Sequence, residues 1–395
     1  MPDDALQKFL DWCHDKGIRS DGLEIRSCQK SGNGLFAMRF FRPDEKLIEL
    51  PEELIITAGK VADLQKYSEL LDETKFFPTS FELLTLFFCI EDSESSFYAP
   101  YINVLPKSFT TPSYMKKYID PVDLPLSARK YWCDQQKELQ ESWKRIHEVV
   151  PEIPYEKFLW AWHVVNTRCI YMENKSHVKV DNSAGDTLAV IPFVDMLNHD
   201  PSAKGLAGYD SYSNKYIVRS THCIMEDEEV TVCYGAHDNA RLWMEYGFTL
   251  PSNPNGKVII EIDQFISLAN NIGLTVSSQH KHVLHSAGLP CTLYLSDEGP
   301  SWALRTNAKI LMLSLSDMKR WRELIYTSLP SDRTNESNLE KDDVKDTVEC
   351  QALEKIILEL KQAVTAGLSK APQDLKWIWQ EQLMIIDATL SYFTH

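Results

Sequence analysis

The apolar residues change their spacing several times along the chain, and this order of patterns constrains the fold more than any other feature. Residues 23–57 have the pattern of short strands and turns, residues 58–185 are mainly helical in pattern, and residues 188–234 return to a strand pattern. After about residue 257 the pattern is largely helical. This order indicates an α+β fold: a β lobe split by a helical insertion and followed by an all-α C-terminal lobe.

The domain limits follow from the same changes of pattern. The 395 residues suffice for two or three domains. We place the first domain at residues 1–256, with the helical insertion at about 58–185, and the second at residues 257–395. The polar stretch 331–346 is predicted to be a loop or linker.

Charge and cysteine content narrow the class of partner. The 57 acidic and 41 basic residues give a net charge of −16, which argues against binding to a nucleic-acid backbone and suits a cationic partner such as a basic peptide segment. Solubility alone is the other explanation of this charge. The nine cysteines include no CxxC pair, and we expect neither a signal peptide nor a membrane span. We therefore expect a reduced protein of the nucleus and cytoplasm.

Four short stretches carry groups that could do chemistry, and each is ambiguous alone. They are SGNGLF (31–36), WHVVNTRCIY (162–171), DMLNH (195–199) and CYGAHDNARLWMEYGF (233–248). Taken singly, they read as a glycine turn, an arginine paired with an acid, a capped polar turn, and a strand end followed by an amphipathic helix. Their order along the chain is more informative than any one of them.

In that order, GxG, a distant TR, NH, YG and YGF resemble the motifs of SET-domain methyltransferases. The flanking stretch YAPYINVLPKSFTTP (98–112) is similar to the branch of the plant Rubisco large-subunit methyltransferase. In that branch a helical insertion splits the SET domain and a helical substrate-binding lobe follows it, and the resemblance covers about residues 5–395. Many SET enzymes have a cysteine-rich zinc segment after the catalytic tyrosine. Here no cysteine lies between Cys233 and Cys291, and we expect no metal.

The resemblance implies the cofactor S-adenosylmethionine, and the residue types suit its parts. Glycine allows close approach of the backbone to the amino acid tail, and Arg168 offers a fork of donors to the carboxylate. Asn198 can accept from the ammonium, the backbone of His199 is expected to read the adenine edge, and Phe248 offers an apolar face to adenine. The expected cofactor-binding residues are Ser31, Gly32, Asn33, Gly34, Arg168, Asp195, Asn198, His199 and Phe248.

Methyl transfer from a sulfonium needs alignment more than acid–base power. A lysine acceptor must first lose its proton, which at neutral pH costs about 4 kcal/mol from a pKa of about 10.4. A nearby sulfonium and a dry channel both disfavour the ammonium form. By resemblance, Tyr234 is the catalytic residue that orients the amine, and Tyr209 and Tyr246 line the lysine channel. We assign no strong general base.

The expected partner is a protein with a basic segment, and the resemblance implies histone H3 or H4 as substrate. We expect a monomer that binds neither nucleic acid nor membrane. One alternative is a histidine acceptor on an actin-like protein, because an enzyme of the same branch methylates histidine. A second alternative is a binding module that keeps the fold and has lost turnover.

Three other patterns have weaker explanations of their own. The histidines of HKHVLH (280–285) have a spacing that metal sites use, without an acid or cysteine near them in sequence. Cys233 with His237, or Cys169 with His199, would suit a hydrolase but lack any hydrolase signature. The acidic runs EDEE (226–229) and EKDD (340–343) are interpreted as solvated turns that could also attract a basic substrate. None of these displaces the methyltransferase hypothesis.

Overall fold

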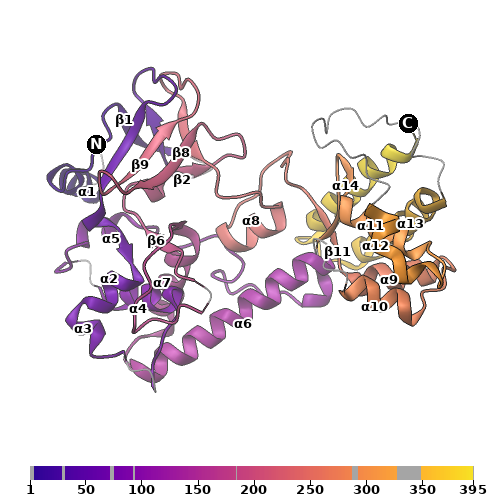
Figure 1. Ribbon diagram of the computed structural model, residues 1–395. Coiled ribbons are helices and arrows are strands. Elements are labelled where there is room, and N and C mark those ends of the chain that lie inside the picture. The colour runs from indigo at the N-terminus through magenta and orange to yellow at the C-terminus, as the bar shows by residue number, and fades with distance from the viewer. Residues whose placement is uncertain are drawn as a thin grey trace. The chain divides into compact units, whose positions relative to one another are not determined.

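The computed structural model describes most of the chain, and that part divides into two compact units (Figure 1). The described residues are 4–28, 32–71, 75–91, 94–183, 185–286, 292–326 and 348–394. The first unit consists of Met1–Lys117, Asp134–His237 and Arg241–Thr249, and the second of Tyr118–Cys133, Asp238–Ala240 and Leu250–His395. The limits 1–256 and 257–395 stay a prediction. Among the described helices, none has both the length and the apolar character needed to cross a bilayer.

A seven-stranded sheet forms the β part of the first unit, in the order β1-β2-β10-β8-β9-β3, with β7 paired to β10. Its strands come from both ends of the unit's sequence, and the helical segment lies between them in the chain. β8 and β9 form a hairpin and pair antiparallel along their length. The strands are β1 (Leu23–Cys28), β2 (Gly32–Ala37), β3 (Lys46–Pro51), β7 (Asn198–His199), β8 (Gly205–Asp210), β9 (Lys215–Ser220) and β10 (Glu229–Val232).

Helices fill the insertion, as the sequence pattern predicts. The N-terminal helix α1 (Asp4–Asp15) precedes the sheet and buries Phe9, Trp12 and Cys13 on one face. In the insertion, α4 begins at a capping box in which Thr79 and Glu82 exchange hydrogen bonds, and its apolar surface is buried almost all round. The helical elements up to residue 168 are η1 (Glu52–Leu54), α2 (Ala58–Asp63), α3 (Gln65–Ser68), α4 (Ser80–Ile90), α5 (Ala99–Val104), η2 (Pro121–Asp123), α6 (Leu126–Val149) and α7 (Tyr155–Arg168).

A small second sheet lies where the insertion leaves and rejoins the β part. It has the order β4-β6-β5, from β4 (Ile56–Thr57), β5 (Cys169–Tyr171) and β6 (Leu188–Val190). Because β5 follows α7 directly and pairs with β6, the end of α7 is held next to the segment that follows β6. That segment runs through η3 (Val194–Met196) into β7. The fold thereby brings together two of the four stretches that the sequence analysis singles out.

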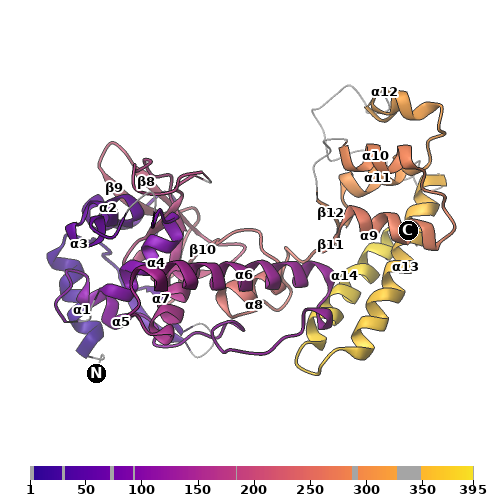
Figure 2. The same cartoon turned by 90° about the horizontal axis from the view of Figure 1, so that it is seen from below.

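The second unit is mainly helical, but it is not all-α as predicted. A three-stranded sheet, β11-β12-β13, is formed by β11 (Val258–Ile260), β12 (Leu293–Ser296) and β13 (Gly299–Pro300). These strands have two to four residues each, too few to show the alternation that marks a strand in sequence. The long helices α13 and α14 lie side by side in both views (Figure 2). The remaining helical elements of the chain are α8 (Asn239–Tyr246), α9 (Ile262–Asn271), α10 (Ser278–Ser286), α11 (Trp302–Leu311), η4 (Asp317–Arg320), α12 (Trp321–Tyr326), α13 (Val348–Lys370) and α14 (Lys376–Thr394).

Candidate functional site

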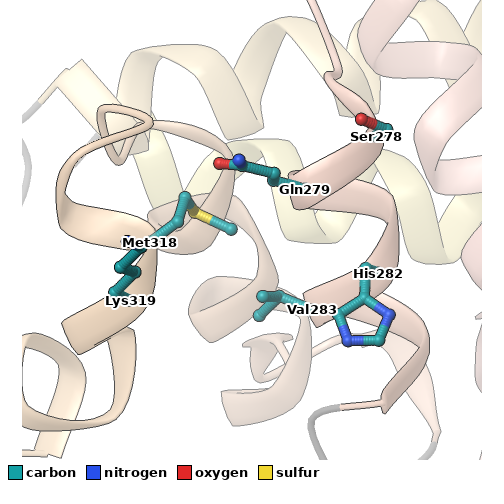
Figure 3. Close-up of a pocket in the computed structure, with 6 residues that line it drawn as sticks. All are labelled: Ser278, Gln279, His282, Val283, Met318 and Lys319. Atoms are coloured by element: carbon teal, nitrogen blue, oxygen red, sulfur yellow. The ribbon is translucent and has the colours of Figure 1, made fainter.

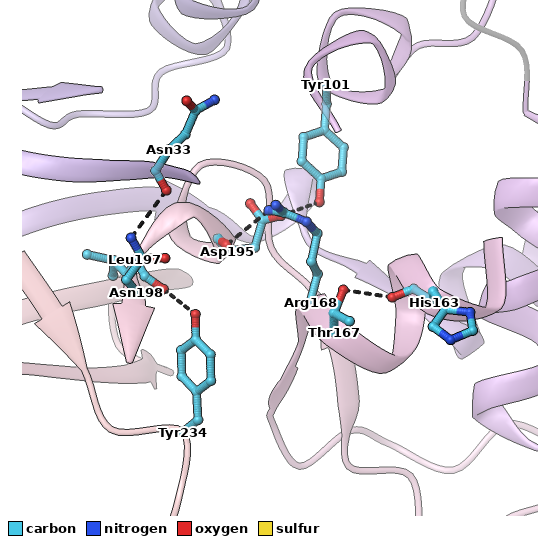
Figure 4. A network of polar contacts seen from close by, with 9 residues as sticks. All are labelled: Asn33, Tyr101, His163, Thr167, Arg168, Asp195, Leu197, Asn198 and Tyr234. Atoms are coloured by element: carbon cyan, nitrogen blue, oxygen red, sulfur yellow. Dashed lines mark hydrogen bonds and ion pairs between the residues drawn. The ribbon is translucent and has the colours of Figure 1, made fainter. Parts of the chain in front are cut away.

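Three strands of the main sheet meet at Gly34 and Asn198. The Asn198 side chain donates from Nδ2 to the carbonyl oxygen of Asn33, at 3.3 Å (Figure 4). The same Nδ2 donates to Oε1 of Glu229, at 2.7 Å. A Cβ at Gly34 would lie 2.8 Å from that same Nδ2 and would overlap Glu229 Oε1. A Cβ at position 34 would therefore displace the Glu229 carboxylate and the Asn198 amide. With Nδ2 engaged twice, Oδ1 of Asn198 is the atom left to accept a hydrogen bond from a ligand.

Arg168, the last residue of α7, is held by a buried carboxylate. Its Nη1 donates to Oδ2 of Asp195 at 2.8 Å and to the backbone oxygen of Asp195 at 3.1 Å. The Tyr101 hydroxyl, from α5, donates to the same Oδ2 at 2.7 Å (Figure 4). Burial opposes the charge on Arg168, but the adjacent Asp195 outweighs it and raises the pKa of the guanidinium. Arg168 and Asp195 therefore form an ion pair whose two charges cancel.

This arrangement changes the role expected of Asp195. Its side chain is 0% exposed and two donors occupy one of its oxygens, so it is not open to direct contact with a cofactor. It acts as a positioning residue for Arg168. Burial, reinforced by Asp195, also raises the pKa of Tyr101 well above its usual value, so its hydroxyl remains a donor. The Arg168 side chain is 20% exposed and can reach a ligand, and its contact with the cofactor carboxylate stays a prediction.

The turn that carries Asp195 is strained. Phe193 has φ 73° and ψ −45°, a left-handed conformation that is unusual for a bulky residue. Its ring is buried and lies 6.4 Å from the ring of Phe9 in α1, which in turn lies 6.0 Å from the ring of Tyr101. Packing against these rings holds the backbone in this conformation.

Aromatic rings surround Tyr234, which follows β10. The rings of His199 and Tyr246 each lie 5.2 Å from the Tyr234 ring, and Phe248 lies 6.2 Å from Tyr246. His199 Nδ1 accepts from the Tyr234 backbone N–H at 3.0 Å, which ties β7 to the residues after β10. The Tyr234 hydroxyl donates to the carbonyl oxygen of Leu197 at 2.6 Å. Burial raises the pKa of this hydroxyl, so it is neutral at physiological pH.

Ser31 lies outside the described residues. Of the predicted site residues that are described, Tyr209 is not part of this arrangement. Tyr209 sits near the far end of β8, and its hydroxyl donates to Glu52 at 2.8 Å and to Asn214 at 3.4 Å. No ring contact joins Tyr209 to the cluster around Tyr234 in the described part of the chain, and its side chain is 39% exposed. The prediction that it lines a channel next to Tyr246 is therefore not supported by these contacts.

Sequence reasoning missed two residues of the site. Glu229 belongs to the acidic run interpreted as a solvated turn, yet it lies on β10 and accepts from Asn198. Tyr101 lies within a stretch quoted only for its resemblance, and no charged or repeated pattern marks it. Their partners are 31 and 94 residues away in the chain, so a local pattern could not reveal either contact.

A second pocket, the buried histidine His280 and the thiol of Cys169 are the other candidates for a functional site. In the second unit a pocket of about 260 Å³ contains none of the predicted site residues, and it is lined by Ser278, Gln279, His282, Val283, Met318 and Lys319 (Figure 3). His280 is buried with its ring nitrogens at Ser277 and at the Leu313 carbonyl. Among the described residues no group of three or more potential ligands is placed to hold a metal. Burial raises the pKa of the Cys169 thiol, which disfavours a reactive thiolate there.

The residues of this site fit S-adenosylmethionine. Gly34 lets the Asn198 amide and the Glu229 carboxylate lie close to the backbone, Asn198 Oδ1 is an open acceptor for an ammonium, and Arg168 offers donors for a carboxylate. The Phe248 and His199 rings, 6.2 Å apart, provide apolar surface for a base. Because the set supplies acceptors, donors and flat apolar surface together, it matches a ligand with an amino acid end and an aromatic end.

The comparison with known families agrees with this arrangement. The family model of the SET domain matches residues 32–235, just over half of the chain, and the chain belongs to the SET-domain family. Among its relatives is SET domain-containing protein 4 of Artemia parthenogenetica, which is 28% identical over 342 residues and covers 85% of each chain. The actin-histidine N-methyltransferase of Xenopus tropicalis is 24% identical over 307 residues, which are 73% of this chain and 50% of that protein.

Solved structures share the fold at lower identity. Rubisco LSMT bound to AdoMet is similar with a TM-score of 0.66 and 17% identity, over 99% of this chain and 92% of that chain. The SET domain of LSMT bound to lysine and AdoHcy is similar with a TM-score of 0.65 and 15% identity, over 99% and 91%. At this identity the likeness concerns the fold, and the α+β, SET-type architecture predicted from the motifs is confirmed.

Proposed function

We propose that this protein is an S-adenosylmethionine-dependent protein-lysine N-methyltransferase. The observation that carries the proposal is the convergence of Gly34, Arg168, Asn198 and Tyr234, from four distant stretches, on one site. Membership of the SET-domain family supports it, as does the likeness in fold to LSMT structures that contain AdoMet or lysine.

The residues around Tyr234 suit transfer to an amine. S-adenosylmethionine supplies a methyl group on a sulfonium, which is already a good leaving group. The Tyr234 O–H is engaged with Leu197, so its oxygen has lone pairs free to accept an N–H and orient the acceptor. The rings of Tyr234, Tyr246 and His199 supply apolar surface around the acceptor, and displacing water from it would disfavour a charged ammonium and favour the neutral amine. Alignment and a dry site are the main contributions of the chain.

We propose a lysine in a basic segment of a protein, such as the tail of histone H3 or H4, as the substrate. The net charge of −16 supports a cationic partner. A histidine on an actin-like protein is the second candidate, supported by the relative named actin-histidine N-methyltransferase. The Tyr246 ring next to Tyr234 supports lysine, because it offers apolar surface to an aliphatic chain.

The test is methylation with isotope-labelled S-adenosylmethionine of a panel of histones, ribosomal proteins and actin, with mass spectrometry of the labelled residue. Label on lysine supports the proposal, and label on histidine supports the second candidate. A protein that binds the cofactor and labels nothing in the panel would instead fit a non-catalytic module. The Tyr234→Phe variant, which keeps the ring and removes the hydroxyl, serves as the control for enzymatic origin of the label.

A further inference from the structure

Glu229 places a carboxylate in the wall of the proposed cofactor site. Its Oε1 accepts a hydrogen bond from Asn198 Nδ2 at 2.7 Å. A Cβ at Gly34 would overlap this same oxygen. The residue therefore lies against both the glycine and the asparagine that are proposed to hold the amino acid end of the cofactor. It is half-buried at the start of β10.

Within the described residues, no cation compensates the charge of Glu229. In the described part of the chain, its partner is the neutral amide of Asn198, and no cation forms an ion pair with it. Its neighbour Glu228 differs, because it pairs with Lys204 at 2.5 Å. The Arg168 guanidinium is already paired with Asp195. Glu229 is therefore a carboxylate of this site without an ion-pair partner among the described residues.

Two acceptor atoms of this wall are open. Glu229 Oε2 and Asn198 Oδ1 have no hydrogen-bond partner within the described residues. Both atoms are accessible to solvent, because neither is one of the buried side-chain atoms that lack a hydrogen-bond partner. Open acceptors of this kind, one of them charged, suit a cationic ligand. Arg168, Tyr246 and Asp195 are the other ionisable groups that act on Tyr234 together with Glu229.

We propose that Glu229 makes the site prefer the cationic methyl donor to the neutral product. The inference rests on the proposed function. S-adenosylmethionine has a sulfonium, an ammonium and a carboxylate and is a net cation, whereas S-adenosylhomocysteine lacks the sulfonium charge and is neutral overall. An uncompensated carboxylate attracts the donor more strongly than the product. The difference helps the product to leave after each transfer, which is a role distinct from holding the ammonium common to both.

The size of the effect is set by a single charge in a partly solvated site. Such an interaction changes affinity about threefold to tenfold, and salt weakens it. The Glu229→Gln variant removes the charge and keeps an oxygen that can accept from Asn198, so it separates charge from hydrogen bonding. Glu228→Gln is the matched control, because Glu228 is adjacent in sequence and its charge is paired with Lys204.

The experiment is calorimetric measurement of Kd for three ligands: S-adenosylmethionine, S-adenosylhomocysteine, and sinefungin, an analogue with an amine in place of the sulfonium. In Glu229→Gln we expect both cations to lose about threefold to tenfold more affinity than S-adenosylhomocysteine. Glu228→Gln should keep the wild-type ratios. In the wild type, 500 mM salt should narrow the gap between donor and product relative to 50 mM, a measurement that needs no variant.

The outcomes separate this inference from the proposed function. If the wild type binds none of the three ligands, the proposed function fails. If it binds them and the donor-to-product ratio is the same in Glu229→Gln as in the wild type, the role of Glu229 is refuted. The same conclusion holds if both glutamate variants change the ratio equally, because that would show a general effect of surface charge.

Discussion

Replacing Gly34 by alanine is the sharpest test of the proposed cofactor site. The added methyl would lie 2.8 Å from Asn198 Nδ2 and closer to Glu229, whereas such atoms normally stay about 3.5 Å apart. The neighbours must move by more than half an ångström, which breaks the Asn198 bonds to Glu229 and to the Asn33 carbonyl. One bond involves a charged group and one does not, so their joint loss costs about 2–4 kcal/mol.

Because these bonds orient the Asn198 amide toward a ligand, the cost should appear in cofactor binding. We expect Kd for S-adenosylmethionine to rise about thirtyfold or more in Gly34→Ala, measured by calorimetry. The control is Gly208→Ala on β8, where an added Cβ meets nothing within 4 Å. If Gly34→Ala binds as tightly as Gly208→Ala, the cofactor does not use this wall and the assignment of the site is wrong.

Three further changes test other parts of the site and core. Tyr101→Phe removes the hydroxyl bound to Asp195 and should lower the free energy of unfolding in urea by about 2 kcal/mol, whereas Tyr98→Phe, whose hydroxyl reaches a carbonyl only at 3.5 Å, should cost less than about 1 kcal/mol. Tyr234→Phe should retain calorimetric cofactor binding and lose about a hundredfold in turnover; unchanged methylation would remove Tyr234 from its role. Burial lowers the pKa of His163 to about 4, so the unfolded chain takes up a proton below about pH 6.5 that the folded chain resists. Stability should therefore fall by up to about 3 kcal/mol from pH 6.5 to pH 4, and His163→Phe should lack this part of the profile; parallel profiles would contradict the reasoning.

Sequence reasoning can propose a site residue where the requirement on that residue is local. Gly34 is identifiable because close approach to the backbone excludes a side chain, and Asn198 because an amide that both donates and accepts is unusual after an apolar run. Glu229 fails this criterion. A glutamate in an acidic run has the same local pattern whether it faces solvent or a ligand, and only the pairing of β10 with β2 and β7 places it in the site.

The differences from the sequence expectations concern short elements and side-chain direction. The β11–β13 sheet was not predicted, because its strands are brief and β13 contains Pro300, which is tolerated at the edge of a sheet. Tyr209 is a tyrosine, a residue type that can line a substrate channel. Its hydroxyl nevertheless finds a partner in Glu52, a contact that depends on how η1 packs near β8. Neither outcome could be read from spacing along the chain.

Because Phe193 has a left-handed backbone conformation, the first helix, α1, contributes to the geometry of the proposed site. A conformation of this kind costs about 1–3 kcal/mol and persists only while its surroundings enforce it. The Phe9 ring of α1 is part of that enforcement. In a chain that starts after α1, the backbone at Phe193 would relax. Arg168 and Asn198 lie on either side of this turn, and they would lose their common alignment. Residues that never approach a ligand thus help to set how precisely it is held.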